Sequence, residues 1–303
     1  MDKHTYDLVI IGGGPAGLTS GIYAQRAGLK TLLLEKEIPG GQVNEAPSIE
    51  NYPGFIEISG MELANKIKEH AASLDLPIEN EAVQKIIDND SEKLIRTSGK
   101  DISAKAIIIA TGAKPRHLEI KGEQEFLGRG VSYCATCDGP LFRGKVVAAI
   151  GGGDRAIKEA LYLSNIVEKV YVIHRRQEFR AEKVNVERLS AKKNVEYVLD
   201  SVAEEIKGEG LVKSLAVKNV KEGTVSELPV NGVFVFVGII PRNEFIEAEK
   251  DSHGFLITKP DLQTSVKGIF AVGDCRSKNL RQVATAVGEG AQAVASVEEY
   301  LHS

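Results

Sequence analysis

Two cysteines separated by two residues form the most reactive motif of the sequence. Cys134 and Cys137 are followed at once by Asp138, and Cys275 stands alone. Three cysteines cannot build a disulfide framework, so the pair indicates thiol–disulfide chemistry or half of a metal site. Zinc takes four ligands, and the six histidines are scattered singly. We therefore favour redox chemistry and expect no metal.

A redox dithiol needs a thiolate and a source of protons. The Cys-x-x-Cys spacing can lower the pKa of one thiol, and a thiolate is the species that attacks a disulfide. Asp138 could protonate the departing thiolate, although an aspartate at this place could equally be a turn or helix-capping residue. For Cys275, next to Asp274, we expect a structural role.

A glycine turn stands near the start of the chain. Gly12, Gly14 and Gly17 fit the pattern G-x-G-x-x-G between a predicted buried strand, 6–11, and a predicted helix, 18–27. These glycines would allow a tight turn, the approach of a pyrophosphate and close packing of helix on strand. The uncapped helix start would attract the phosphates. The segment therefore predicts a dinucleotide site.

The same unit recurs more than a hundred residues later. Gly151, Gly153 and Ala156 give the form G-x-G-x-x-A, between a predicted strand, 145–150, and a predicted helix, 156–165. The repeat predicts two dinucleotide-binding folds in tandem.

The residues after the second strand of each unit differ. Glu35 follows the strand 31–34, where an acid can hold a ribose hydroxyl. The second unit has basic residues there instead, which suit the 2′-phosphate of NADP. These basic residues are His174, Arg175, Arg176 and Arg180. A solvated basic turn is the plain alternative.

The other predicted elements complete an α/β chain. Short apolar runs at 106–110 and 269–272 predict further buried strands, and 284–301 predicts a helix. The segments 81–96 and 195–235 alternate in the manner of antiparallel strands. With 303 residues and ~150 residues per domain, two domains are expected.

Charge and hydropathy exclude several classes of protein. The formal net charge is −4, which argues against broad binding to nucleic acid or to anionic membranes. The apolar stretch 233–240 is far shorter than the ~20 residues of a membrane span. The start of the chain is unlike a secretory signal. We expect a cytoplasmic protein with no membrane and no nucleic-acid partner.

Together these motifs resemble the low-molecular-weight, bacterial-type thioredoxin reductases, a class II group of the pyridine nucleotide-disulfide oxidoreductases. The resemblance covers the whole chain, and its specific part is the cysteine motif joined to both dinucleotide turns. Further matching segments are 40–42, 49–55, 110–112, 179–181, 273–274 and 281–282.

The resemblance implies an α/β fold of two Rossmann-like, three-layer ββα domains, the second inserted into the first. An FAD-binding domain would comprise 1–113 and 243–303, and an NADPH-binding domain with the cysteine pair would comprise 114–242. Electrons would pass from NADPH through FAD and the Cys134–Cys137 disulfide to thioredoxin or a thioredoxin-like protein. The family is homodimeric.

The resemblance also implies roles for single residues. Cys137 would face the flavin, Cys134 would attack the thioredoxin disulfide, and Asp138 would be the acid. The implied FAD contacts are Gly12, Gly14, Pro15, Ala16, Gly17, Glu35, Gly41, Gln42, Asn51, Val83, Gly112, Gly273, Asp274, Arg281, Gln282 and Val283. The implied NADPH contacts are Gly151, Gly153, Asp154, Arg155, His174, Arg175, Arg176 and Arg180.

Two residues depart from the family pattern. Arg155 stands where the family has a small, often hydroxyl-bearing residue, and Lys158 stands where an acid is frequent. Arg155 could grip the coenzyme pyrophosphate, fill its place, or face solvent. This departure motivates a same-fold reductase fed by NADH or ferredoxin as an alternative. A non-catalytic redox sensor is a third hypothesis, which the cysteine pair opposes.

The resemblance also raises a problem of access. The cysteine pair and the second glycine turn share the segment 114–242, yet both the disulfide and the nicotinamide must reach one flavin. We therefore expect this domain to rotate about the connectors 112–117 and 240–243.

Overall fold

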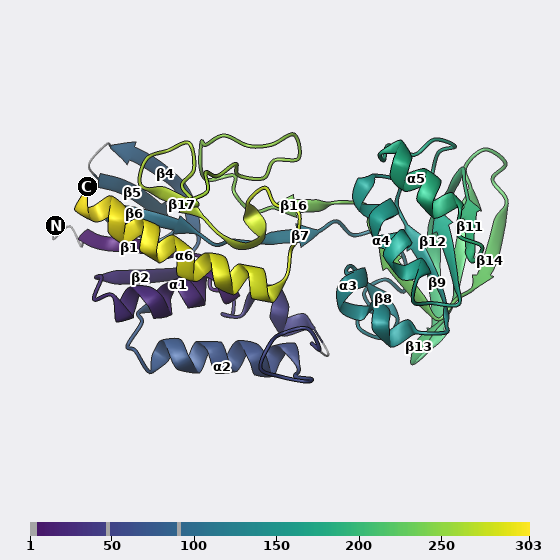
Figure 1. Ribbon diagram of the computed structural model, residues 1–303, viewed down its shortest axis with the longest axis horizontal. Helices are drawn as coiled ribbons and strands as arrows, with labels where there is room; N and C mark the ends of the chain where they lie inside the picture. Colours follow the sequence, from purple (N-terminus) through teal and green to yellow (C-terminus); the bar gives the residue numbers. More distant parts are fainter. Residues whose placement is uncertain (1–4, 47–48, 90–91) are drawn as a thin grey trace. The chain divides into compact units, whose positions relative to one another are not determined.

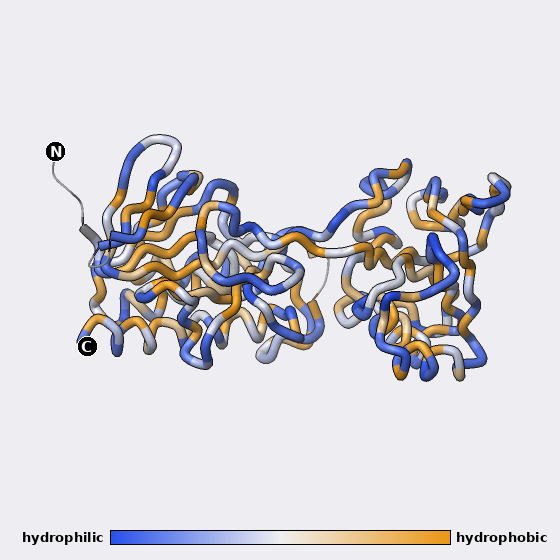
Figure 2. The backbone as a smooth tube through the Cα atoms, turned by 90° about the horizontal axis from the view of Figure 1, so that it is seen from above, coloured by the Kyte–Doolittle hydropathy of each residue, from blue (hydrophilic) through white to orange (hydrophobic). Residues whose placement is uncertain are grey.

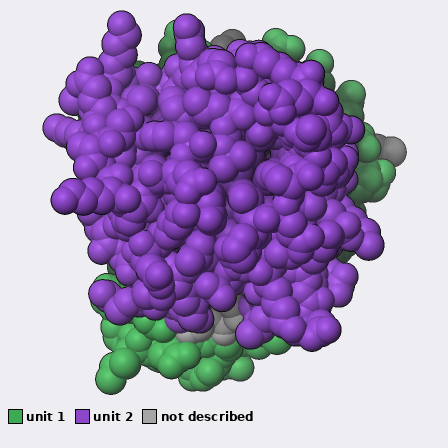
Figure 3. Space-filling view, turned by 90° about the vertical axis from the view of Figure 1, so that its right-hand side faces the viewer, with its two compact units in different colours: residues 1–114, 240–303 green, residues 115–239 purple. Residues whose placement is uncertain are grey.

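The computed structural model describes residues 5–46, 49–89 and 92–303. The chain divides into two compact units (Figures 1 and 3), which are Met1–Lys114 with Ile240–Ser303, called unit 1, and Pro115–Ile239, called unit 2. Two short strands, β7 (Ala113–Pro115) and β16 (Ile239–Pro241), pair where the chain passes between the units.

Unit 1 is built on a seven-stranded sheet. Six of its strands have the order β3-β2-β1-β6-β5-β4, and the seventh, β17, pairs with residues 107–109 of β6. β1, β2, β3, β6 and β17 run parallel, whereas β4, β5 and β6 form antiparallel pairs. The strands are β1 (Thr5–Ile11), β2 (Thr31–Glu35), β3 (Ile78–Asn80), β4 (Val83–Asn89), β5 (Glu92–Thr97), β6 (Asp101–Ile109) and β17 (Ile269–Ala271).

Helices cover one face of this sheet. Leu8 and Ile10 of β1 pack toward α1 and α6, whereas Val9 and Ile11 pack into a second core on the opposite face. A strand with consecutive apolar residues, such as 8–11 of β1, can fill both cores, because successive side chains point to opposite faces. The helices are α1 (Pro15–Arg26), α2 (Gly60–Ala72) and α6 (Val283–His302), with short 3-10 turns η1 (Gly41–Glu45) and η3 (Gly273–Cys275).

Unit 2 has three layers. A parallel sheet with the order β11-β10-β9-β15-β8 lies between the helices α3, α4 and α5 and an antiparallel sheet, β12-β13-β14. The parallel strands are β8 (Val131–Ser132), β9 (Val146–Ile150), β10 (Lys169–Ile173), β11 (Val195–Val198) and β15 (Gly232–Val235). The other elements are α3 (Ala135–Asp138), η2 (Gly139–Phe142), α4 (Asp154–Ser164), α5 (Lys183–Ser190), β12 (Ser201–Glu209), β13 (Leu211–Asn219) and β14 (Val225–Pro229).

Hydrophobic residues, orange in Figure 2, are concentrated along the central strands of each unit. The strand–turn–helix–strand pattern occurs once in each unit, as β1-α1-β2 and β9-α4-β10. The prediction of an α/β chain with two Rossmann-like folds is therefore confirmed. Among the described residues, none of the helices is long and apolar enough to cross a membrane.

One prediction about strand direction is wrong. The alternation in 195–235 predicts antiparallel strands, but only β12, β13 and β14 are antiparallel, whereas β11 and β15 pair in parallel with β10 and β9. β11 lies at the edge of its sheet and has one exposed and three partly buried residues, so it lacks the continuous burial of a central parallel strand. β15 is buried along its whole length between two neighbours.

Candidate active site

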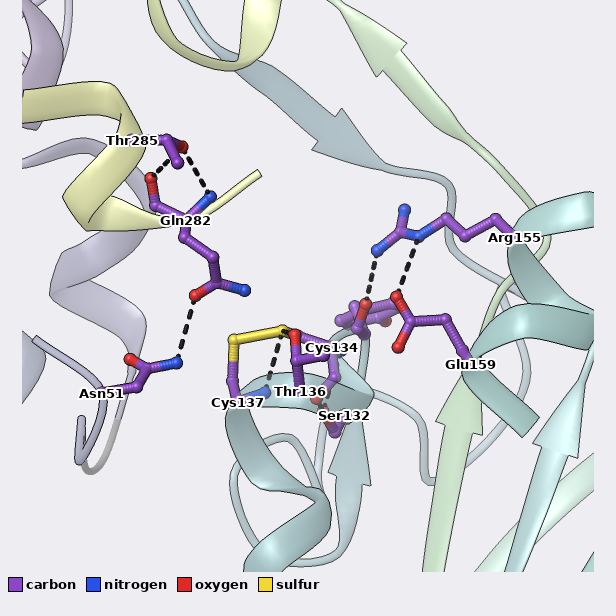
Figure 4. The surroundings of a disulfide bond; sticks show 10 residues. Asn51, Ser132, Cys134, Thr136, Cys137, Arg155, Glu159, Gln282 and Thr285 are labelled. Carbon is purple, nitrogen blue, oxygen red and sulfur yellow. Dashed lines mark hydrogen bonds and ion pairs between the residues drawn. A yellow bond between two sulfur atoms is a disulfide. The ribbon is translucent and has the colours of Figure 1, made fainter. Parts of the chain in front are cut away.

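The cysteine pair forms a disulfide at the start of a one-turn helix (Figure 4). Cys134 and Cys137 have a Cα–Cα distance of 5.3 Å. Cys134 caps α3, and its Sγ accepts a hydrogen bond of 3.2 Å from the backbone N–H of Cys137. Ser132 fixes the backbone before the helix, since its Oγ accepts a hydrogen bond of 3.0 Å from the Cys134 N–H. The N–H that faces Cys134 Sγ would stabilise a thiolate there once the disulfide is reduced.

Asp138 ends the same helix turn. Burial raises the pKa of its carboxyl, and a hydrogen bond involving the Ser132 side chain opposes this shift. A carboxyl with a raised pKa keeps a proton to a higher pH than an ordinary aspartate does. This environment suits a proton donor, and the Asp138 side chain makes no capping hydrogen bond to η2, the helix turn that follows it.

The second glycine turn connects β9 to α4. A Cβ on Gly151 would lie 2.6 Å from the carbonyl oxygen of Phe236, so the turn needs a glycine there. A Cβ on Gly153 would meet none of the described atoms within 4 Å. Gly153 is also the N-cap of α4 and offers no side chain to its first N–H groups. This open, uncapped helix start is suited to phosphate groups.

His174 supports the turn from beneath. Its ring fills the place that a Cβ on Gly152 would take, at 2.2 Å, and stacks on Phe179 with a centroid distance of 5.2 Å. The residue is 7% exposed, and its ring Nε2 lies 3.2 Å from the carbonyl oxygen of Glu178. Burial, with a smaller contribution from the neighbouring arginines, lowers the pKa of His174. A neutral, buried imidazole positions the turn and does not supply a positive charge.

The charge near this turn belongs to the exposed arginines. Arg175 and Arg176 directly follow His174, and the backbone N–H of Arg180 donates to the Gly152 carbonyl at 2.8 Å. Asp154 has a local role, since its carboxylate accepts from the Glu182 N–H at 2.7 Å.

Arg155 and Lys158, the two departures, both have partners within unit 2. The Arg155 guanidinium donates to the carbonyl oxygen of Tyr133 at 2.9 Å and lies 3.9 Å from the Glu159 carboxylate. Lys158 lies 3.6 Å from the carboxylate of Glu182. Sequence reasoning missed Tyr133 and Glu159, and only the four-residue spacing of Arg155 and Glu159 on a helix signals that pair.

The first glycine turn repeats this plan in unit 1. A Cβ on Gly17 would lie 1.8 Å from the Gly12 carbonyl oxygen, so helix and turn touch here. Gly14 is open among the described residues and caps α1 without a side chain. Glu35, at the end of β2, accepts from the Gly13 N–H with Oε2 at 2.6 Å. α1 begins at Pro15, earlier than predicted, because proline suits the first helical position.

Two distant segments join this turn. The Gly40 N–H donates to the Gly13 carbonyl at 2.8 Å, and a Cβ on Gly41 would lie 3.4 Å from the Gly14 Cα. Gly273 lies against Ala16, since a Cβ on Gly273 would lie 3.2 Å from the Cβ of Ala16. Of the remaining predicted residues, Gln42 lies in η1, and Asn51 donates from Nδ2 to Oε1 of Gln282 at 3.2 Å.

The other predicted residues of unit 1 lie at element ends. Val283 begins α6, Gly112 has a positive φ of 66°, and Val83 begins β4 close to the Glu81 N–H that donates to the Glu35 carbonyl. The Arg281 guanidinium lies over the Phe255 ring, 4.2 Å from its centroid.

An ionic cluster beside Asp274 was not predicted. Glu289 of α6 accepts from the Gly273 N–H at 2.7 Å and pairs with Arg276 at 2.9 Å and with Lys278 at 3.1 Å. Lys278 also lies 3.7 Å from Asp274. The four side chains come together only through the packing of η3 on α6, so nothing in their spacing pointed to the cluster.

Cys275 is a buried free cysteine. Its Sγ donates to the carbonyl oxygens of Ile109 and Val272, and burial raises its pKa to about 11. At neutral pH this thiol stays protonated and unreactive. No group of three or more His, Cys, Asp or Glu side chains within the described ranges could hold a metal ion.

The comparisons with known proteins agree with this geometry. The family model "Pyridine nucleotide-disulphide oxidoreductase" matches residues 6–290. A thioredoxin reductase of Treponema pallidum (strain Nichols) is 45% identical over 98% of this chain and 97% of its own length. One from Bacillus subtilis (strain 168) is 39% identical over 99% and 96%. The crystal structure of thioredoxin reductase from Streptococcus pyogenes MGAS5005 has a TM-score of 0.94 and 44% identity over 99% of both chains.

Two glycine turns, a Cys-x-x-Cys disulfide and full-length similarity therefore lead to one conclusion. The chain belongs to the pyridine nucleotide-disulphide oxidoreductase family, among the thioredoxin reductases.

Proposed function

We propose that this chain is an NADPH-dependent flavoprotein that reduces thioredoxin or a thioredoxin-like protein. One observation carries the proposal. The Cys134–Cys137 disulfide and a glycine turn followed by exposed arginines share unit 2, while unit 1 has a second glycine turn with an acid. A dithiol with two dinucleotide sites fits electron transfer from a nicotinamide to a protein disulfide.

Unit 1 fits FAD. The open Gly14 and the uncapped start of α1 leave N–H groups for a pyrophosphate. Glu35 can exchange its hydrogen bond with the Gly13 N–H for ribose hydroxyls. Bound FAD would supply two-electron chemistry between a nicotinamide and a disulfide. The residues proposed to hold it are Gly12, Gly14, Pro15, Ala16, Gly17, Glu35, Gly41, Gln42, Asn51, Val83, Gly112, Gly273, Asp274, Arg281, Gln282 and Val283.

Unit 2 fits NADPH. The open Gly153 at the start of α4 can accept a pyrophosphate, and Gly151 makes the tight turn. Arg175, Arg176 and Arg180 have planar, permanently charged guanidinium groups suited to a 2′-phosphate.

The reduced cysteine pair would carry out thiol–disulfide exchange. We assign the attack to Cys134, because the Cys137 N–H stabilises a negative charge on its sulfur. The thiolate of Cys134 bonds to one sulfur of the thioredoxin disulfide and expels the other, which takes a proton from Asp138. Cys137 then attacks Cys134, which releases the second thioredoxin sulfur and restores the Cys134–Cys137 disulfide. Two electrons leave the pair in each cycle.

Three further features belong to the same proposal. The chain would act as a homodimer in the cytoplasm. Unit 2 would rotate about the paired connectors β7 and β16 during the cycle, so that the disulfide and the nicotinamide use the flavin in turn.

The test follows the visible spectrum of the anaerobic holoprotein during additions of NADPH, NADH and then oxidised thioredoxin. We expect bleaching by NADPH at lower concentration than by NADH, and recovery of the flavin band with thioredoxin. The variant Cys137→Ser should keep bound flavin that NADPH bleaches but should not reduce thioredoxin. A holoprotein that is bleached only by a reduced ferredoxin, or that never reduces a protein disulfide, contradicts the proposal.

A further inference from the structure

Arg155 contacts the backbone beside the redox disulfide. It is the second residue of α4, yet its guanidinium donates to the carbonyl oxygen of Tyr133, directly before Cys134, at 2.9 Å (Figure 4). The same group lies over the Phe236 ring, with 5.9 Å from Cζ to the centroid. The side chain is 38% exposed, so it is held by contacts on its inner side.

Glu159 extends this contact to the other side of Cys134. It lies one helical turn after Arg155, with 3.9 Å between Oε1 and the Arg155 Nε. Burial raises the pKa of Glu159, and the Arg155 charge and the backbone N–H of Ala135 offset part of that shift. The peptide groups before and after Cys134 therefore both interact with side chains of α4.

The Tyr133 side chain is anchored independently. Its hydroxyl donates to Glu123 Oε1 at 2.8 Å and lies 2.7 Å from His117 Nδ1. Glu123 is 1% exposed and also accepts from the N–H groups of Leu118 and Glu119, each at 2.8 Å. With the ring of Tyr133 fixed in this way, its carbonyl is the part that Arg155 holds.

We propose that Arg155, acting with Glu159, is a positioning residue for Cys134 and not a ligand of the coenzyme phosphate. This inference rests on the proposed function only in taking the disulfide as redox-active. The guanidinium fixes the peptide that carries Cys134 and offsets the effect of burial on the Glu159 carboxyl, which interacts with the Ala135 N–H. Without it, the peptide before Cys134 gains freedom and a positive charge is lost beside α3, and both changes disfavour a Cys134 thiolate.

The experiment compares Arg155→Met and Arg155→Lys with the parent holoprotein. Lys158→Met is the matched control, because Lys158 lies on the same helix and pairs with Glu182 instead. The fully reduced proteins are treated with iodoacetamide at pH 7, and carboxamidomethylation of Cys134 is followed by mass spectrometry. The dithiol–disulfide equilibrium is measured in glutathione buffers, and NADP⁺ binding by calorimetry.

We expect Arg155→Met to slow the alkylation of Cys134 by roughly three- to tenfold, because a rise of one pKa unit removes about nine tenths of the thiolate. The equilibrium should also move toward the disulfide, by up to about tenfold where the parent thiol is ionised at pH 7 and by less where it is protonated, because only the ionised thiol adds to the stability of the dithiol. Arg155→Lys should recover part of both losses, since it keeps the charge but not the fork of donors. Lys158→Met should match the parent, and the dissociation constant of NADP⁺ should stay within about twofold.

Unchanged thiol chemistry in a folded Arg155→Met protein overturns the proposal. A weaker binding of NADP⁺ with unchanged alkylation would assign Arg155 to the phosphate instead. If Arg155→Met fails to fold, Arg155→Lys decides alone. A rate of Cys134 alkylation and a dithiol–disulfide equilibrium equal to those of the parent would then contradict a positioning role for the Arg155 guanidinium. The thiol measurements use neither NADPH nor thioredoxin, so a failure of the proposed function leaves their outcome readable.

Discussion

The two glycine turns share a backbone plan but differ in the residue that lies against their middle glycine. In unit 1, a Cβ on Gly13 would lie 3.2 Å from the Glu35 side chain, and in unit 2 a Cβ on Gly152 would lie 2.2 Å from the His174 ring. Glu35 accepts a hydrogen bond from the turn, whereas the buried His174 only fills space beneath it. One structural position therefore carries a hydrogen-bonding carboxylate in one unit and a packing imidazole in the other.

This difference explains where the positive charge is found. Burial lowers the pKa of His174, so it does not provide a cation at neutral pH. The arginines that follow are exposed and permanently charged. In a cluster of basic residues, only the exposed members are therefore available to bind a phosphate, and the buried ones have a packing role.

The largest expected effect comes from removing this charge. In the proposed NADPH site, the double variant Arg175→Ala/Arg176→Ala should lose charge-assisted hydrogen bonds to the 2′-phosphate worth roughly 1.5–3 kcal/mol each. At the lower end, suited to exposed groups, the KM for NADPH rises about a hundredfold. Steady-state kinetics with NADPH and NADH measure it, and Arg188→Ala, an exposed site on α5, is the control. Equal losses with both coenzymes would remove the distinction between the two turns.

A matched pair of glycine variants separates the two sites. A methyl group at Gly14 or at Gly153 meets none of the described atoms within 4 Å, so both proteins should fold. Gly14→Ala should weaken FAD binding on the order of tenfold and Gly153→Ala should weaken NADP⁺ binding similarly, because each methyl occupies space that a pyrophosphate needs. Flavin content by absorbance and calorimetry with NADP⁺ give the readouts. Loss of FAD from Gly153→Ala would contradict the assignment of the turns.

A smaller effect distinguishes carboxyl groups of the two units. Burial raises the pKa of Asp138 in unit 2 above 3.8, whereas a hydrogen bond from Lys105 lowers the pKa of Asp7 in unit 1 below it. Asp138 therefore costs stability as pH rises through its folded pKa, and Asp7 loses its stabilisation as pH falls through its own.

Melting curves of the oxidised protein between about pH 2 and pH 8 test this contrast. Asp138→Asn should gain a few degrees in Tm relative to the parent as pH rises. Asp7→Asn should lie below the parent at neutral pH, by less because the pair is at the surface, and should converge with it at acid pH. Parallel curves for all three proteins would show that neither carboxyl is perturbed as described.

The smallest effect is expected at the buried thiol of unit 1. Cys275→Ser keeps a donor for the carbonyl oxygens of Ile109 and Val272, so turnover should be unchanged and stability should shift by about 1 kcal/mol or less. Cys134→Ser, in contrast, should abolish disulfide reduction. A Cys275→Ser protein with intact folding and impaired turnover would mean that the redox chemistry is not confined to unit 2.

Much of this molecule could be predicted from local sequence. Short apolar strands that end in glycines predicted β1-α1-β2 and β9-α4-β10, because the tight turn, the helix start and the buried strand are all decided by neighbouring residues. The same holds for the Cys-x-x-Cys motif, whose disulfide closes over only three residues. Strand direction in 195–235 was mispredicted, because pairing depends on partners far away in the chain.

Tertiary structure alone decided what several side chains do. The sequence places Arg155 next to the glycine turn, but only the packing of α3 on α4 brings its guanidinium to Tyr133. The ionic cluster of Arg276, Lys278 and Glu289 likewise forms through the packing of α6 on η3. The chemical type of a residue is written in the sequence, whereas its partner, burial and pKa depend on which distant segments the fold brings within a few ångströms.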